Sequence, residues 1–207
     1  MLAGACPIYV FGCIAMKTEE FNRILQTNGI SVFSLEDASR IIGKPKHYTT
    51  VFLRRDRIVK RAANGVYYTP DASNYEIASS IVEPSYVSLI SALSFHNITE
   101  QIPNTIYVLS SKRHSGISID GTRMEFVKVK PSLMFGYKKI DGTMVAEPEK
   151  AIVDMLYLGR FEEYAEEAME SKVISREKLV GFAELAGRKS LVKRIEKLLE
   201  KIEERIL

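Results

Sequence analysis

Basic side chains gather in one short stretch of the sequence, and their chemistry suits phosphate binding. Between Lys44 and Arg61 the chain carries seven Lys and Arg residues against one acid, Asp56. Ammonium and guanidinium groups at this density bind nucleic-acid phosphates through charge and hydrogen bonds. The residues expected to contact DNA are these cations and their polar neighbours: Lys44, Lys46, His47, Thr49, Thr50, Arg54, Arg55, Arg57, Lys60 and Arg61.

This positive charge is local, because the whole chain carries only +3. Residues 16–70 have a net charge of +5, whereas residues 71–207 have a net charge of −2. The asymmetry favours an amino-terminal region that faces DNA, joined to a region with a different task. The alternative is an interaction module whose basic face is only solvated.

A second basic group, Lys112, Arg113 and His114, follows a predicted strand. These side chains are candidates for phosphate binding or for a second nucleic-acid contact, although the loop lacks the Gly-Lys-Thr ending of a nucleotide-binding loop. Lys150 and Asp154 stand one helical turn apart in an apolar segment. A structural ion pair is expected there rather than acid–base catalysis.

No pattern in the sequence predicts catalysis or a metal. The histidines His47, His96 and His114 are not spaced with a second His, a Cys or a carboxylate as metal ligands would be. Cys6 and Cys13 both precede the first charged residue and form no zinc motif. We therefore expect no catalytic residue, metal or cofactor. A cytoplasmic protein without a membrane partner is expected, because no apolar run reaches the ~18 residues of a membrane span.

The elements around the main basic stretch predict a winged helix-turn-helix. Thr18 is a candidate N-cap for the first helix, and Ser34 and Asp37 resemble the capping box of the second. Three helices precede a hairpin, with the expected ranges 18–27, 35–42 and 45–55 for the helices and 58–61 and 66–69 for the strands. In such domains the third helix enters the major groove of DNA.

The third helix is the one that must position the cations. Tyr48, Val51 and Phe52 are expected to face the core, which would leave the basic and polar residues of this helix outside. Asn64-Gly65 is a strong hairpin signal, because both residues tolerate a positive φ. Pro45 is expected to be the first residue of the helix.

The sequence divides into three parts with an α+β fold: an extension at residues 1–15, the winged helix at 16–70 and a mixed α/β domain at 75–207. The α/β domain is expected to hold a small sheet and carboxy-terminal helices. Its expected helices cover 75–82, 84–95, 151–157, 161–170, 175–186 and 189–205. Its expected strands cover 105–110 and 125–129, with weaker candidates at 116–119 and 134–140.

Several segments, in this order and spacing, resemble the AbiEi family, the antitoxins of abortive-infection (type IV) toxin–antitoxin systems. Members are also described as predicted transcriptional regulators of viral defence systems. The segments extend over most of the chain: Phe33-Ser34-Leu35, Gly65-Val66-Tyr67-Tyr68, the run from Ser85 to His96, Gln101-Ile102-Pro103, and the run from Ala146 to Asp154.

The resemblance implies a DNA-binding autorepressor that binds repeats in its own promoter. It also implies that the chain neutralises a nucleotidyltransferase-like toxin encoded beside it, with or without stable contact. Two alternatives remain open: a stand-alone winged-helix transcriptional regulator, and an enzyme that acts on the toxin or its substrate through the carboxy-terminal domain. The sequence leaves a homodimer open as well.

Overall fold

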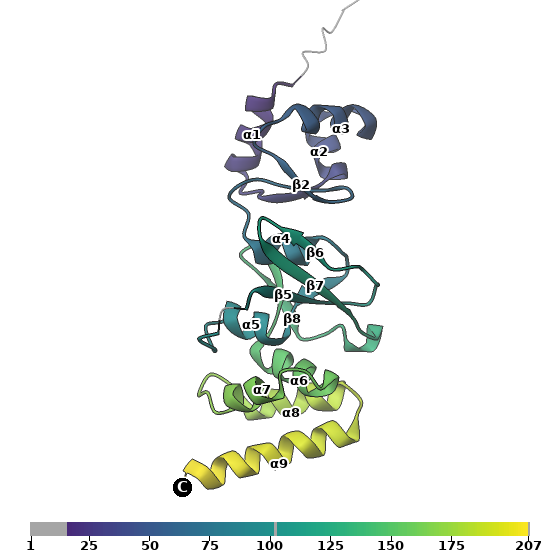
Figure 1. The fold of residues 1–207 in the computed structure, drawn as a ribbon. Coiled ribbons are helices and arrows are strands. Elements are labelled where there is room, and N and C mark those ends of the chain that lie inside the picture. The colour runs from purple at the N-terminus through teal and green to yellow at the C-terminus, as the bar shows by residue number, and fades with distance from the viewer. Residues whose placement is uncertain (1–15, 102, 207) are drawn as a thin grey trace, which may run out of the picture.

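The computed structural model describes residues 16–101 and 103–206. The extension at residues 1–15, with Cys6 and Cys13, lies outside the described residues, as does Ile102 of the segment Gln101-Ile102-Pro103. The described chain is an elongated stack, in which a small helical unit, a central sheet and a group of helices follow one another (Figure 1). Helices and sheets occur in both the small and the larger unit, so the fold is α+β.

The small unit holds the predicted helices and hairpin, plus one further strand. Its elements are α1 (Thr18–Thr27), β1 (Val32–Ser34), α2 (Leu35–Ile42), α3 (Lys46–Arg55), β2 (Lys60–Ala63) and β3 (Val66–Tyr68). The strands form an antiparallel sheet in the order β1-β3-β2. Phe21, Leu25, Phe33, Leu53 and Tyr67 are among the residues of its hydrophobic core.

Local hydrogen bonds explain where α2 begins and ends. The Ser34 hydroxyl accepts from the Asp37 N–H at 3.1 Å, and the Asp37 carboxylate accepts from the Ser34 N–H at 3.1 Å, so the predicted capping box is confirmed. Gly43 ends the helix with a φ of 67°, a left-handed conformation that glycine adopts without strain.

Three boundary predictions in this unit were wrong. Thr18 is the first residue of α1, and Lys17 holds the N-cap position without a side-chain hydrogen bond. Pro45 is the N-cap of α3 rather than its first residue. Strand β2 begins at Lys60, two residues after the predicted start at residue 58. The Asp56 carboxylate accepts from the N–H groups of Ile58 and Val59 at 2.8 and 3.2 Å, and these bonds hold both residues in a turn.

The larger unit is built on a mixed six-stranded sheet in the order β6-β7-β5-β4-β9-β8. Strands β4 and β9 are parallel, as are β5 and β7, whereas the pairs β4-β5, β6-β7 and β8-β9 are antiparallel. The strands are β4 (Ser85–Val87), β5 (Thr105–Ser110), β6 (Ile117–Ile119), β7 (Thr122–Lys128), β8 (Tyr137–Ile140) and β9 (Thr143–Ala146).

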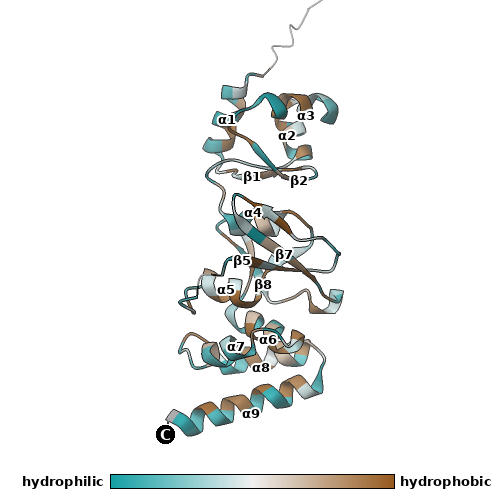
Figure 2. Cartoon of the chain, in the orientation of Figure 1, coloured by the Kyte–Doolittle hydropathy of each residue, from teal (hydrophilic) through white to brown (hydrophobic). Residues whose placement is uncertain are grey.

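Helices cover this sheet and extend the stack. Helix α4 packs on β4, β5 and β9 and also contacts β1 of the small unit, while α5 and α6 pack against β5 and β9 respectively. The α-helices of this unit are α4 (Asn74–Ser80), α5 (Leu89–Phe95), α6 (Pro148–Leu158), α7 (Glu162–Met169), α8 (Arg176–Leu185) and α9 (Lys189–Ile206), and a 3-10 turn spans Pro131–Leu133. Helix α9 buries Leu191, Ile195 and Leu199 and alternates hydrophobic with hydrophilic residues along its length (Figure 2).

The helix predicted over residues 84–95 was the main error in this unit. Ser85–Val87 is a central strand, and the helix begins only at Leu89. All three strand residues are buried. A short strand that is buried on both faces lacks the alternation of polar and apolar residues by which a strand is told from a helix. Strand β9 was not predicted from the sequence, and it is likewise largely buried.

Lys150 and Asp154 form the predicted structural ion pair inside the larger core, so this expectation is confirmed. Both side chains are buried, and Lys150 Nζ donates to Asp154 Oδ1. The hydroxyls of Tyr86 and Ser88 donate to Asp154 Oδ2 at 3.1 and 2.8 Å. The Lys150 ammonium also lies 4.5 Å from the centre of the Phe135 ring. The pair is thus completed by groups from two other segments, β4 with the residue that follows it and the loop that holds Phe135.

The two units meet through a few polar contacts near the predicted boundary. Ser31 Oγ lies 2.7 Å from both carboxylate oxygens of Glu76, at the start of α4. The Tyr68 hydroxyl of β3 donates to Asp120 Oδ2 of the larger unit at 3.0 Å. Tyr68, the last residue of β3, packs in the core of the larger unit. The winged helix is therefore held against the larger unit by side chains as well as by the connecting chain.

Candidate nucleic-acid interface

Helix α3 presents four of the expected basic residues to solvent at the end of the stack distant from α9 (Figure 1). Lys46, His47, Arg54 and Arg55 of this helix are exposed, as is Arg57 in the turn that follows it. Asp56, the one acid of this stretch, is buried and binds Asn22 Nδ2 at 3.0 Å in addition to the turn. Its carboxylate therefore accepts hydrogen bonds that stabilise the local fold.

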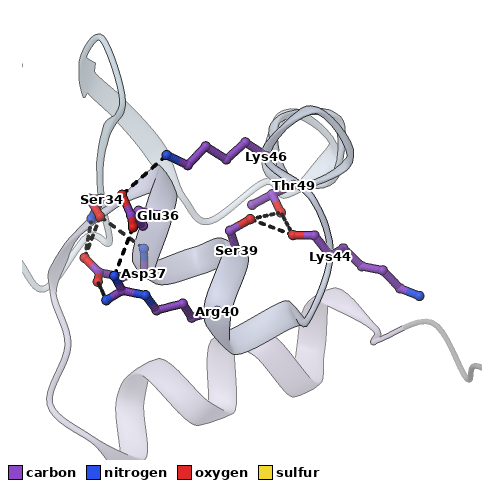
Figure 3. Close-up of polar contacts among 8 residues, drawn as sticks. All are labelled: Ser34, Glu36, Asp37, Ser39, Arg40, Lys44, Lys46 and Thr49. Atoms are coloured by element: carbon purple, nitrogen blue, oxygen red, sulfur yellow. Dashed lines mark hydrogen bonds and ion pairs between the residues drawn. The ribbon is translucent and has the colours of Figure 1, made fainter.

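Thr49 was predicted to contact DNA, and the structure contradicts this. Its side chain is 0% exposed, and its hydroxyl lies 3.2 Å from the carbonyl oxygen of Pro45 and 3.4 Å from Ser39 Oγ (Figure 3). Ser39 belongs to α2, so Thr49 fixes the start of α3 against the preceding helix. The Thr50 hydroxyl is half-buried and donates to the Lys46 carbonyl at 2.8 Å within the helix.

The burial of Thr49 shows that the helix is rotated from the predicted orientation. Thr49 and Leu53 face the core, whereas Tyr48 and Val51, which were expected inside, are 37% and 47% exposed. Phe52 is half-buried and packs on Phe21. The spacing of four between Thr49 and Leu53 was the signal that could have given the correct face, but a threonine carries little hydrophobic weight. The outer face of α3 therefore mixes apolar side chains with cations.

Lys46 connects the two helices of the helix-turn-helix through an exposed ion pair. Its ammonium lies 3.3 Å from Glu36 on α2, and Arg40 lies 2.9 Å from the same carboxylate (Figure 3). The hydrogen bond from Lys46 and then its charge lower the pKa of Glu36. Exposed pairs of this kind are weak, so a phosphate can replace Glu36 as the partner of Lys46. The half-buried Lys44 side chain extends away from this pair (Figure 3).

The two hairpin cations, Lys60 and Arg61, both have side-chain partners in the structure. Lys60 lies 3.1 Å from Asp120 of the larger unit, and the Tyr68 hydroxyl donates to the same carboxylate at 3.0 Å. The hydrogen bond from Lys60, followed by that from Tyr68, lowers the pKa of Asp120. Arg61 folds back onto the hairpin, where it donates to the Asn64 side-chain oxygen at 2.8 Å. Lys60 thus joins the two units instead of extending freely from the hairpin.

The second basic group does not form one site. Lys112 and Arg113 are exposed, but the half-buried His114 ring packs on Phe126 at 4.7 Å between ring centres. His114 Nδ1 lies 2.7 Å from the Ser115 carbonyl oxygen. Lys112 instead lines a cavity with residues of the β8-β9 hairpin. The three residues therefore have different surroundings.

The remaining features of the described residues concern metals and membranes. In residues 16–101 and 103–206, no group of three or more His, Cys, Asp or Glu side chains is placed to hold a metal ion. Over these same ranges, no helix combines the length and the apolar character that a membrane span requires.

His96 Nε2 lies 2.9 Å from the Ala146 carbonyl oxygen, and this contact connects the end of α5 to β9.

Comparison with known proteins identifies a related fold. No family model matches the chain, and no curated protein matches it. Among solved structures, the crystal structure of the RV2827C protein from Mycobacterium tuberculosis is similar, with a TM-score of 0.52 and 14% sequence identity. The match covers 87% of this chain and 75% of that one. At this identity the likeness shows a common fold over most of the chain.

Proposed function

We propose that this protein is a DNA-binding autorepressor in which α3 enters the major groove. The observation that carries the proposal is the division of α3 into two faces. Thr49 and Leu53 fix the helix on its own domain, Arg54 and Arg55 are exposed in its last turn, and Lys46 is exposed at its first residue. Rigid placement of an exposed basic helix is what major-groove binding requires.

The salt dependence of promoter binding tests this proposal. If Lys44, Lys46, Arg54, Arg55 and Arg57 engage about five phosphates per protomer, the slope of log affinity against log salt should be about −4 to −5 per protomer. Fluorescence anisotropy with a labelled duplex from the region upstream of the protein's own gene measures it. A duplex of scrambled sequence is the control for specificity. A slope near zero would refute the phosphate contacts.

We propose further that the protein is the antitoxin of a type IV system of the AbiE kind, directed at a nucleotidyltransferase-like toxin. The support is the segment resemblance together with the size of the second unit, which is larger than DNA docking by the winged helix needs. The protein would act without a cofactor or a catalytic site. A stand-alone regulator without a toxin, or an enzyme using the second unit, are the alternatives.

Co-expression with the toxin encoded next to the protein separates repression from neutralisation. The full chain carrying Arg54→Glu and Arg55→Glu, expressed from an unrelated promoter, is expected to restore growth as well as the wild type does. The reason is that neutralisation is assigned to the larger unit, which these residues do not contact. If protection disappears together with DNA binding, the protein acts only by silencing transcription, and the stand-alone regulator gains support.

A further inference from the structure

A cavity of about 560 Å³ opens at the end of the six-stranded sheet where β4 and β9 begin. Its walls come from the end of α4 and the turn that follows it, the start of β4, the loop after β5, and the β8-β9 hairpin. A volume of this size falls in the range of small-molecule sites. The larger cleft between α8 and α9 has four glutamates against two cations in its lining, and these cations, Arg176 and Lys178, are already paired with Glu203 and Glu147.

Two lysines give the smaller cavity its charge. Lys112 and Lys139 both line it, both are exposed, and neither has an ion-pair partner among the residues that the structure describes. Glu83 also lines the cavity but lies within ion-pair distance of neither lysine. Lys138, the neighbour of Lys139 on β8, lies 3.8 Å from Glu147 instead. The cavity therefore has two uncommitted ammonium groups.

Most other polar groups of the cavity wall form hydrogen bonds within the protein. Ser85 Oγ donates to the Ser79 carbonyl at 2.9 Å, and Ser79 Oγ accepts from the Met144 N–H at 3.2 Å. The Tyr137 ring is stacked on Tyr86 at 4.5 Å, which fixes this side of the cavity. The wall is thus preformed, and the lysines are its main groups available to an anion.

We propose that this cavity binds a small phosphorylated molecule, with its phosphate between Lys112 and Lys139. A phosphate monoester carries nearly two negative charges at pH 7, which match two ammonium groups better than the single charge of a carboxylate does. Lysine suits phosphate as a mobile point charge that needs no fixed fork geometry. Pro84, Met144 and the edge of Tyr137 provide apolar surface for the rest of the molecule.

The cavity is adjacent to the contact that holds the winged helix. Gly142 lines the cavity with a φ of 82°, and a Cβ atom added to it would lie only 2.7 Å from Glu76 Oε1. Glu76 is the residue whose carboxylate accepts from Ser31 of the small unit. A ligand that shifts the β8-β9 hairpin should therefore change the Ser31–Glu76 contact between the two units.

Isothermal titration of the full chain tests the site without any DNA, so its outcome is independent of the proposed function. Three probes are used: inorganic phosphate, pyrophosphate and adenosine 5′-monophosphate, with uncharged adenosine as the reference. At least one phosphate probe should bind. That affinity should fall about tenfold or more in Lys112→Gln and in Lys139→Gln, a loss of ~1.4 kcal/mol per tenfold.

Lys138→Gln is the matched control, because it removes the same charge one residue away and should leave the affinity unchanged. Stronger binding of the nucleotide than of the inorganic anions would identify an organic phosphate as the ligand, and the reverse order would identify a free phosphate anion. Absence of binding for all three anions at millimolar concentration would overturn the proposal. So would equal binding by the two lysine variants and the wild type, with circular dichroism showing that they are folded.

Discussion

Replacement of Arg54 and Arg55 by glutamate is expected to weaken binding to the protein's own promoter DNA by about a hundredfold or more. The reason is that the loss of one arginine–DNA contact costs ~1–3 kcal/mol. Both side chains are exposed in the last turn of α3. The adjacent Asp56 forms no ion pair with either arginine among the described residues, and its carboxylate accepts from Ile58, Val59 and Asn22 instead. Reversal of the charge turns two attractive phosphate contacts into repulsive ones.

The same variant should also have a shallower salt dependence. Loss of two phosphate contacts reduces the magnitude of the log–log slope by about 1.8. Titration of labelled promoter duplex at several salt concentrations gives both the affinity and the slope. The matched control is Lys128→Glu/Lys130→Glu, which changes the net charge equally at exposed residues of the larger unit and should weaken binding much less.

A folding control is needed because basic residues at a helix C-terminus stabilise the helix dipole by ~0.3–1 kcal/mol each. Thermal unfolding of the variant should therefore remain cooperative, with only a small loss of stability. Promoter affinity that is unchanged in the folded variant would remove α3 from the interface. Equal losses in the variant and in the control would indicate attraction by net charge alone.

Replacement of Lys150 by methionine is expected to lower the free energy of unfolding by about 3–5 kcal/mol, because the buried Asp154 carboxylate loses its counter-charge. Burial lowers the pKa of Lys150 and raises the pKa of Asp154, so each ion depends on the other to remain charged. Methionine preserves most of the volume of the lysine side chain, which limits the contribution of a cavity. Urea unfolding followed by circular dichroism measures the loss.

The double variant Lys150→Met/Asp154→Asn tests whether charge is the cause. Asparagine keeps an oxygen that can accept from the Tyr86 and Ser88 hydroxyls, so the double variant should recover a large part of the lost stability. Lys138→Met, at an exposed position of β8, should change the stability by less than about 0.5 kcal/mol. A single-variant loss below about 1 kcal/mol would contradict the ion-pair interpretation.

A pH series gives a second, independent measurement on Lys150→Met. Without the lysine, Asp154 has a folded pKa that burial raises above its unfolded value of ~3.9. The ionisation penalty is then present above the unfolded pKa and is relieved as the pH falls towards it. The stability difference between Lys150→Met and the wild type should therefore shrink as the pH is lowered from 7.

Several features of the small unit follow from local sequence signals and were predicted correctly, although the Thr18 cap and the position of Pro45 were not. The Ser34–Asp37 capping box, Gly43 after α2 and the Asn64-Gly65 turn each depend on side chains within a few residues of one another. Such interactions are nearly the same in any surroundings. The clustering of basic residues between Lys44 and Arg61 and the α+β fold class were likewise visible in the sequence.

The tertiary structure alone decided which side chains are available. The contact of Thr49 with Ser39 of α2 fixes the rotation of α3, and the contact of Lys60 with Asp120 directs that lysine to the larger unit. Ser85–Val87 became a strand because β5 and β9 supply hydrogen-bonding partners on both sides. Lys112 and Lys139 line one cavity although they are 27 positions apart in the chain. All of these depend on partners far away in sequence, whose positions local propensity does not encode.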